Sequence, residues 1–226
     1  MRPLAEELTN SQSNARPMNT LRRTLLLVLV LFITPAAVNS HEGVIPVIVD
    51  TDMALDDIRA LTLLLQNRQF DLLAVVTSDG SAAVDVGARN AARVLHFLHR
   101  PEVIVGAGPR LDREPPPWRS HSDALGWADL PPANSSVVGN ASSILSRVLQ
   151  NAEQRVTYIC LGPLTNLAAA LRTNPSLAER LRSIYYSGAP PGKVPPSWNT
   201  ARDTAAAQQV FNAGIPIYSV SLDKLT

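Results

Sequence analysis

Short apolar runs alternate with amphipathic segments from residue 44 onward. The runs are too short for helices and rich in β-branched residues, which predicts buried strands at 44–49, 70–77, 103–105, 156–160, 184–187 and 217–220. Apolar positions three and four residues apart predict helices between them, at 56–67, 83–99, 142–151, 163–172 and 201–213. This alternation predicts an α/β fold, a mostly parallel, Rossmann-like open sheet with helices on both faces.

Two segments interrupt the alternation. Residues 109–136 hold many prolines and tryptophans without a clear period, and residues 189–200 form a second stretch rich in Pro and Gly. Long connections of this kind are usually functional loops, so we expect the first to lie over a ligand site. In a parallel sheet, that site is expected where the strands end.

The first forty residues have the order of a secretory signal peptide. Arg22 and Arg23 precede an apolar run at 25–33, and small residues follow at 35–40. The run is shorter than the roughly 20 residues that a membrane-spanning helix needs. We therefore expect a leader over 1–40, cleaved near Ala37 or after Ser40, and a secreted or extracytoplasmic α/β domain over 41–226. An uncleaved signal anchor and a true start at Met18 are the alternatives.

Composition excludes some partners. The 226 residues carry a net charge of +1, which gives no reason to expect nucleic acid or an anionic membrane surface as a partner. The single cysteine, Cys160, lies in the apolar run 156–160 and is expected to be a buried structural thiol. In a eukaryotic host, Asn134 and Asn140 would begin glycosylation sequons.

Four carboxylates stand close together where the first strand ends and the first helix begins. They belong to Asp50, Asp52, Asp56 and Asp57, within eight residues. Anions at this spacing repel one another, and the helix N-terminus offsets only part of their charge. A hard divalent cation with oxygen ligands would balance them. The alternative is that Asp56 and Asp57 only cap the helix while Asp50 and Asp52 face water.

The segment Asp-Thr-Asp-x-x-x-Asp-Asp at 50–57 resembles a signature of the inosine-uridine preferring nucleoside hydrolase family. A second family signature is matched by Leu-Gly-Pro-Leu-Thr-Asn-Leu-Ala at 161–168. Weaker likenesses follow the same order along the chain, at 71–95, 121–126, 198–199, 203–207 and 222–223. The resemblance spans roughly residues 45–226 and implies the fold of that family.

The resemblance also implies a function, the calcium-dependent hydrolysis of the N-glycosidic bond of ribonucleosides to ribose and a free base. Such a reaction passes through an oxocarbenium-like ribose. A nucleoside N-ribohydrolase of this kind would take a small-molecule substrate and would be able to form homo-oligomers. The implied roles are Asp52 as general base and calcium ligand, Asp57 and the Leu161 carbonyl as further ligands, Asp56 and Asn199 as ribose contacts, and Asp50 as a supporting residue.

The chain departs from the family pattern at several positions. Met53-Ala54 replaces Pro-Gly, which puts Ala54 where a positive φ would be costly. Asp79-Gly80-Ser81 replaces Ala-Gly-Asn, and Ser197 replaces Glu. The sequence ends at Thr226, before the His-Asp pair that the family carries, which predicts weak calcium affinity.

These departures keep two other functions open. A non-catalytic protein that binds nucleosides or sugars on the same scaffold is the first. A phosphatase of the haloacid dehalogenase class is the second, although Ala54 stands where that class needs Thr or Val. Among the remaining polar residues, we expect Thr165 and Asn166 to cap the following helix. We expect His121 to be an exposed loop residue and Asp223 to end a strand.

Overall fold

The computed structural model describes residues 43–127 and 138–220. The chain divides into two units, Met1–His41 and Glu42–Thr226, and the described residues belong to the second. The predicted leader at 1–40, the sequon at Asn134 and the strand end at Asp223 lie outside the described residues.

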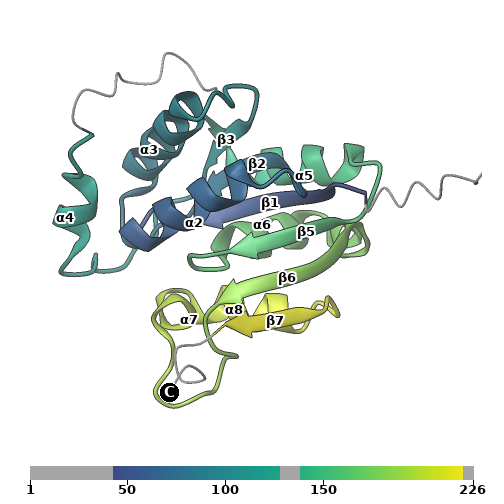
Figure 1. Ribbon diagram of the computed structural model, residues 1–226. Helices are drawn as coiled ribbons and strands as arrows, with labels where there is room; N and C mark the ends of the chain where they lie inside the picture. The colour runs from purple at the N-terminus through teal and green to yellow at the C-terminus, as the bar shows by residue number, and fades with distance from the viewer. Residues whose placement is uncertain (1–42, 128–137, 221–226) are drawn as a thin grey trace, which may run out of the picture. The chain divides into compact units, whose positions relative to one another are not determined.

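The described strands form one seven-stranded sheet in which every neighbouring pair is parallel (Figure 1). Their order in the sheet is β4-β3-β2-β1-β5-β6-β7. The first four strands are therefore laid down outward from β1 in one direction, and the last three in the other. The strands are β1 (Ile45–Thr51), β2 (Phe70–Thr77), β3 (Ile104–Ala107), β4 (Val138–Asn140), β5 (Val156–Cys160), β6 (Leu181–Ser187) and β7 (Ile217–Val220).

The reversal of strand order lies between β1 and β5. Asp50 is in register with Val76 of β2 on one side and with Cys160 of β5 on the other. Ligands of open parallel sheets bind beyond the carboxyl ends of the strands at such a switch point. The carboxyl end of β1 carries Asp50, so the acidic segment lies where the topology favours a site.

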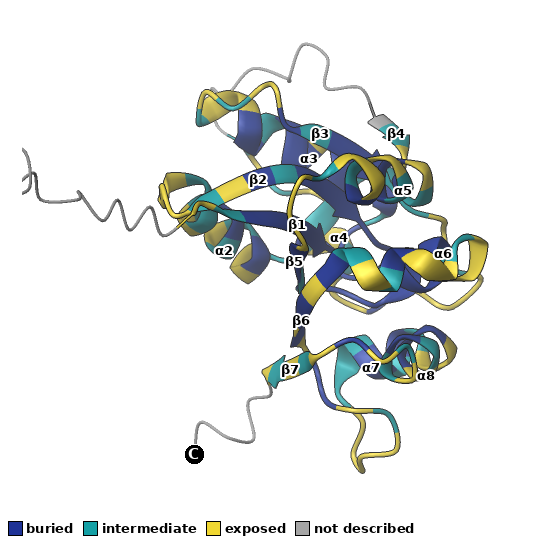
Figure 2. Ribbon diagram, turned by 90° about the vertical axis from the view of Figure 1, so that its right-hand side faces the viewer, coloured by how far each residue is buried: buried dark blue, intermediate teal, exposed yellow. Residues whose placement is uncertain are grey.

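Helices cover both faces of the sheet, in two layers that Figures 1 and 2 show from different sides. The helices α2 and α3 pack on one face against the strands from β1 to β3, and α5, α6 and α8 pack on the other. The helices are α2 (Leu55–Gln66), α3 (Val84–Phe97), α4 (Arg119–Asp123), α5 (Ala141–Asn151), α6 (Thr165–Thr173), α7 (Trp198–Arg202) and α8 (Thr204–Phe211), with a 3-10 helix η1 (Pro175–Arg180).

The predicted fold class is confirmed: the domain is α/β with an open parallel sheet and helices on both faces. Three elements were not predicted, α4, β4 and η1, each too short to produce a periodic pattern. The helix expected at 201–213 is two helices, α7 and α8, which meet at Asp203. Asp203 caps α8 by accepting a hydrogen bond from the Ala206 N–H at 3.1 Å. None of the described helices has the length and apolar character that a bilayer-spanning segment requires.

Candidate functional site

Three of the four clustered carboxylates are buried at the carboxyl end of β1. Asp50, Asp52 and Asp57 are at most 5% exposed, whereas Asp56, on the first turn of α2, is exposed. The alternative in which Asp50 and Asp52 face water is therefore wrong. Charged side chains are rarely buried to this extent unless they are paired or bind a metal.

Thr51 joins the strand end to the helix start. Its hydroxyl accepts a hydrogen bond from the Met53 N–H at 2.9 Å and donates one to Asp57 Oδ2 at 2.7 Å. This turn places Met53 in the left-handed region, with φ at 55°, while Ala54 has φ at −62°. The expectation that Ala54 would bear the positive φ is wrong, because the reversal comes one residue earlier.

Backbone from two neighbouring strand ends surrounds Asp52. Its Oδ2 accepts a hydrogen bond from the Ser81 N–H at 2.9 Å, and its carbonyl accepts one from the Ala82 N–H at 2.9 Å. A Cβ at Gly80 would lie 2.0 Å from Asp52 Oδ2, and a Cβ at Gly162 would lie 3.0 Å from Asp52 Cβ. Only glycine leaves room at these two positions, so the loops after β2 and β5 fix the Asp52 carboxylate from two sides.

Asp50 lies one layer below and supports the site from the core. Its Oδ2 accepts a hydrogen bond from Tyr158 Oη at 2.7 Å, and its Oδ1 accepts one from Asn166 Nδ2 at 3.1 Å. Burial raises the pKa of Asp50 to about 7, although both hydrogen bonds act in the opposite direction. This environment suits the supporting role that the resemblance implies. Asp50 is fully buried, and both of its carboxylate oxygens accept hydrogen bonds from inside the protein.

Tyr158 and Asn166 were not predicted as site residues. Asn166 Nδ2 also donates to the Thr77 carbonyl at 3.0 Å, and Thr165 Oγ1 donates to Asp203 Oδ2 at 2.7 Å. The expectation that Thr165 and Asn166 cap α6 is wrong, because the N-cap is Leu164 and no side chain caps it. A helix cap and a buried partner for a carboxylate use the same residue types, so the sequence did not separate them.

The two remaining buried carboxylates, Asp52 and Asp57, have no basic side chain as a partner in the described part of the chain. Burial raises the pKa of both Asp52 and Asp57, and the charge of Asp52 raises the pKa of Asp57 further. Within the described residues, no ion pair joins either carboxylate to a basic side chain. Arg119 and Arg202, which donate hydrogen bonds to the backbone of residues 79–80 after β2, both pair with Asp79.

Leu161 and Asn199 meet at the end of β5. The Leu161 carbonyl accepts a hydrogen bond from Asn199 Nδ2 at 2.7 Å, and the same nitrogen donates to the Ser187 carbonyl at 2.8 Å. Asn199 thus ties the ends of β5 and β6 to α7 and orients the Leu161 carbonyl. Its amide nitrogen is engaged by these two carbonyls.

The donor set fits a hard cation but is small. Asp52 and Asp57 supply carboxylate oxygens and Leu161 a carbonyl oxygen, which are the ligand types that calcium prefers. Among the described residues, no three His, Cys, Asp or Glu side chains converge closely enough to hold an ion by themselves. Calcium takes six to eight oxygen ligands, so water and substrate hydroxyls would have to supply several of them.

The loop that was expected over the site does lie beside it in its described part. Trp118 Nε1 donates to Ser81 Oγ at 3.3 Å, and the Trp118 ring lies 5.5 Å from the ring of Trp198 on α7. His121 is exposed on α4, as expected. Ser197, where the family pattern has Glu, accepts a hydrogen bond from the Ala189 N–H at 2.8 Å and therefore shapes its own loop.

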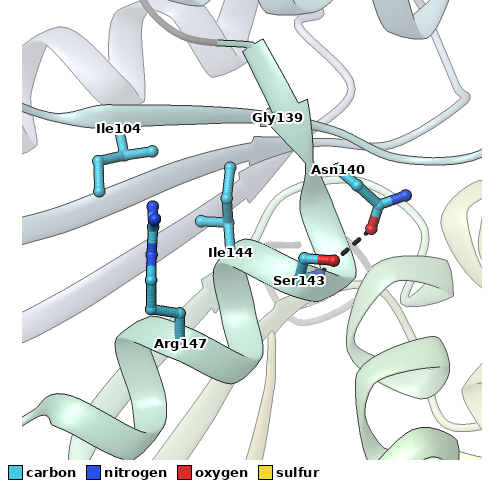
Figure 3. Close-up of a pocket in the computed structure, with 6 residues that line it drawn as sticks. All are labelled: Ile104, Gly139, Asn140, Ser143, Ile144 and Arg147. Atoms are coloured by element: carbon cyan, nitrogen blue, oxygen red, sulfur yellow. Dashed lines mark hydrogen bonds between the residues drawn. The ribbon is translucent and has the colours of Figure 1, made fainter.

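A separate cavity lies at the edge of the sheet between β3, β4 and α5 (Figure 3). It has a volume of about 420 Å³, and no sequence-predicted site residue lines it. Asn140 points toward its rim while its Oδ1 caps α5, accepting hydrogen bonds from the Ser142 and Ser143 N–H groups. This cavity is not part of the candidate site.

Known structures share this fold. A plant nucleoside hydrolase is 26% identical with a TM-score of 0.71, over 80% of this chain and 61% of its own. The nucleoside hydrolase of Bacillus anthracis described as inosine-uridine preferring has a TM-score of 0.70 at 24% identity, over 79% of this chain and 65% of its own. At that identity the second match shows the fold alone.

Curated proteins are also similar to this chain in sequence. An uncharacterised protein of Schizosaccharomyces pombe is 34% identical over 188 residues, which are 78% of this chain and 61% of that protein. The pyrimidine-specific ribonucleoside hydrolase RihA of Salmonella schwarzengrund is 30% identical over 190 residues, 79% of this chain and 60% of its own length. The chain thus spans about 60% of the length of these relatives. Residues 47–226 match the family described as inosine-uridine preferring nucleoside hydrolase, and the chain belongs to that family.

Proposed function

We propose that this protein hydrolyses the N-glycosidic bond of ribonucleosides, giving ribose and a free base, with calcium as its metal ion. The observation that carries the proposal is the pair of buried carboxylates, Asp52 and Asp57, at the switch point of the sheet without a compensating basic side chain among the described residues. A cation bound beside them would offset the cost of keeping both carboxylates ionised at a buried position. Their position in a chain of this family supports a nucleoside as the ligand held beside that cation.

The residues divide the chemistry among them. Asp52, with one oxygen held by the Ser81 N–H, is placed to take a proton from water as general base. Asp56 is exposed on the neighbouring helix turn and can accept hydrogen bonds from ribose hydroxyls. The group of carboxylates stabilises positive charge that develops on the ribose ring. A bound calcium ion would supply a Lewis acid for hydroxyl groups and water.

Ribose release from inosine and from uridine by the purified chain, with calcium or with a chelator, tests this proposal. We expect calcium-dependent release, and we expect Asp52→Ala to lower kcat/KM by about 10²- to 10⁴-fold, the usual contribution of a general base. Asp85→Ala is the matched control, because Asp85 is a surface aspartate on α3 that pairs with Arg89 and Arg110. Equal rates for the Asp52→Ala variant and the unchanged chain would contradict the role of Asp52.

A non-catalytic nucleoside-binding protein is the second candidate. Two side chains that replace polar family residues are engaged in internal hydrogen bonds: Ser81 Oγ accepts from Trp118, and Ser197 Oγ accepts from Ala189. Each hydroxyl would have to give up or share this hydrogen bond to contact a substrate. Calorimetric binding of inosine and uridine without ribose release would favour this candidate over hydrolysis.

We also propose that the protein is exported and that its subunits associate. The basic, apolar and small-residue order of residues 22–40 supports export. N-terminal sequencing of the protein recovered outside the expressing cells would test it, with a start near residue 38 or 41 expected. Sedimentation velocity would test association, and a monomer at all concentrations would contradict it.

A further inference from the structure

Asp79 lies at the centre of a buried ion cluster beside the candidate site. Its Oδ1 pairs with the Nη2 atoms of both Arg119 and Arg202, the latter at 3.1 Å. Its Oδ2 accepts a hydrogen bond from the Leu111 N–H at 2.8 Å. The Asp79 and Arg202 side chains are 4% and 5% exposed, and Arg119 is 16% exposed. We call Asp79, Arg119 and Arg202 the Asp79 clamp.

The clamp draws three distant segments together. Asp79 follows β2, Arg119 belongs to α4 and Arg202 to α7. Arg202 Nη1 also donates to the Glu114 carbonyl at 2.6 Å, which fastens α7 to the loop before α4. Figure 1 shows α4 and α7 on the side toward which the arrowheads of β1 and β6 point. The clamp therefore closes two otherwise irregular loops around the carboxyl end of the sheet.

The same guanidinium groups hold the backbone that contacts Asp52. Arg119 Nε donates to the Gly80 carbonyl at 3.2 Å, and Arg202 Nε donates to the Asp79 carbonyl at 3.3 Å. The next residue, Ser81, donates its N–H to Asp52 Oδ2 at 2.9 Å. One continuous path of hydrogen bonds thus runs from the two arginines through residues 79–81 to the carboxylate proposed as base and metal ligand.

Asp79 also determines which carboxylate the guanidinium groups of Arg119 and Arg202 pair with. Asp79 engages both guanidinium groups, so neither pairs with Asp52 or Asp57 among the described residues. Without Asp79, both guanidinium groups would lose their carboxylate partner and would be free to compete with calcium for Asp52 and Asp57. Asp79 stands where the family pattern quoted above has alanine, so the sequence of the signature alone gives no role to this position.

We propose that Asp79, Arg119 and Arg202 are positioning residues that hold Asp52 in place and keep Asp52 and Asp57 available for calcium. The inference rests on the proposed calcium site, but the path from the clamp to the Ser81 N–H does not depend on metal. Supporting groups around metal ligands typically change metal affinity or activity by about 10- to 100-fold. The clamp should therefore affect calcium affinity without contacting the ion.

Two measurements on the full chain test the clamp. Calorimetric calcium titration should show an affinity at least about tenfold weaker in Asp79→Ala than in the unchanged chain. Hydrogen exchange in the absence of metal should become faster at the Ser81 amide and across residues 109–127. Glu102→Ala is the matched control, because Glu102 pairs with Arg100 at an exposed position just before β3, outside the segments that are measured. It should leave both readouts unchanged.

A conservative variant separates positioning from folding. Arg202→Lys keeps the charge but loses the planar fork that reaches Asp79 and the Glu114 carbonyl together. It should fold, as circular dichroism can show, and should weaken calcium binding less than Asp79→Ala does. Unchanged calcium affinity and unchanged exchange at Ser81 in a folded Asp79→Ala variant would overturn the inference. If the unchanged chain does not bind calcium, the proposal of calcium as the metal is wrong. The exchange rate of the Ser81 amide in the Asp79→Ala variant would then test by itself whether the clamp holds Asp52 in place.

Discussion

The two halves of the sheet differ in how many of their faces are covered. The strands from β1 to β3 lie between α2 and α3 on one face and α5 and α6 on the other, and most of their side chains are buried. Among the described residues, helices cover β6 and β7 on one face only, and more buried and more exposed positions largely alternate along the two strands (Figure 2). The exposed positions include Tyr185, Tyr218 and Val220, which are 44%, 55% and 59% exposed.

The difference in coverage explains which half of the sheet contains the buried carboxylates. Asp50 and Asp52 are fixed in the doubly covered half, with backbone from β2 and β5 packed around them. The singly covered half contributes mainly Asn199 on α7, whose amide nitrogen donates to the Leu161 carbonyl and to the carbonyl of Ser187 at the end of β6. The buried carboxylates therefore come from one half, and the polar contact to the Leu161 carbonyl comes from the other.

The largest contrast should appear on α2, in the covered half. Leu61 is fully buried between α2 and the sheet, whereas Leu63, two residues later, is 70% exposed. We expect Leu61→Ala to lower the free energy of unfolding by about 2–5 kcal/mol, because it leaves a cavity in a packed core. Leu63→Ala should change it by at most about 0.5 kcal/mol.

Urea unfolding followed by circular dichroism measures both variants. Equal losses for Leu61→Ala and Leu63→Ala would mean that α2 does not pack on the sheet in the register described. Equal losses would also contradict the division into a doubly covered and a singly covered half, because α2 is one of the two helices that cover the second face of β1 to β3.

A smaller effect is expected at the boundary between the halves, on β5. Tyr158 is fully buried, and its hydroxyl donates to Asp50 Oδ2 at 2.7 Å. Tyr158→Phe keeps the ring but leaves a buried carboxylate without this donor, so we expect a loss of about 1–3 kcal/mol in unfolding free energy. The measurement is again urea unfolding, with Tyr185→Phe as the control because Tyr185 is half exposed on the open face. A neutral Tyr158→Phe would show that Asn166 alone supports Asp50.

Periodicity was sufficient to predict most of the fold. The continuous apolar run of β1 and the exact bounds of β2, β5 and β7 follow from patterns that need no tertiary information. The elements that were missed, α4, β4 and η1, owe their existence to contacts rather than to pattern. Arg119, for example, fixes α4 against Asp79 and Gly80, residues that lie about forty positions earlier.

The candidate site could be predicted only in part. The acidic spacing indicated a group of four carboxylates at a strand end, and the family resemblance singled out Asp52 and Asp57 among them as metal ligands. Their partners could not be found this way: Tyr158 lies 108 residues and Asn166 116 residues from Asp50. Asp79 looked like an ordinary loop residue, since nothing local reveals that two arginines from distant helices converge on it. Long-range pairing of polar groups leaves no periodic trace in a single sequence.

The smallest effect is expected on the open face itself. The rings of Tyr185 on β6 and Tyr218 on β7 stack with centroids 5.0 Å apart and an interplanar angle of 21°. Such a pair contributes about 0.5–1.5 kcal/mol beyond buried area, and solvent on one side reduces it. We expect Tyr185→Thr and Tyr218→Thr each to lower the unfolding free energy by less than about 1 kcal/mol, since threonine also suits a strand.

A double-mutant cycle in urea measures the coupling between the two rings, and we expect it to fall below about 1 kcal/mol. A larger coupling would mean that the open face is packed more tightly than its exposure indicates, for instance because other groups cover it in solution. In that case the two halves would differ in coverage only when the chain is considered by itself, and not in solution. The contact between Asn199 and the Ser187 carbonyl would then lie in a half that is covered as fully as the half around Asp52.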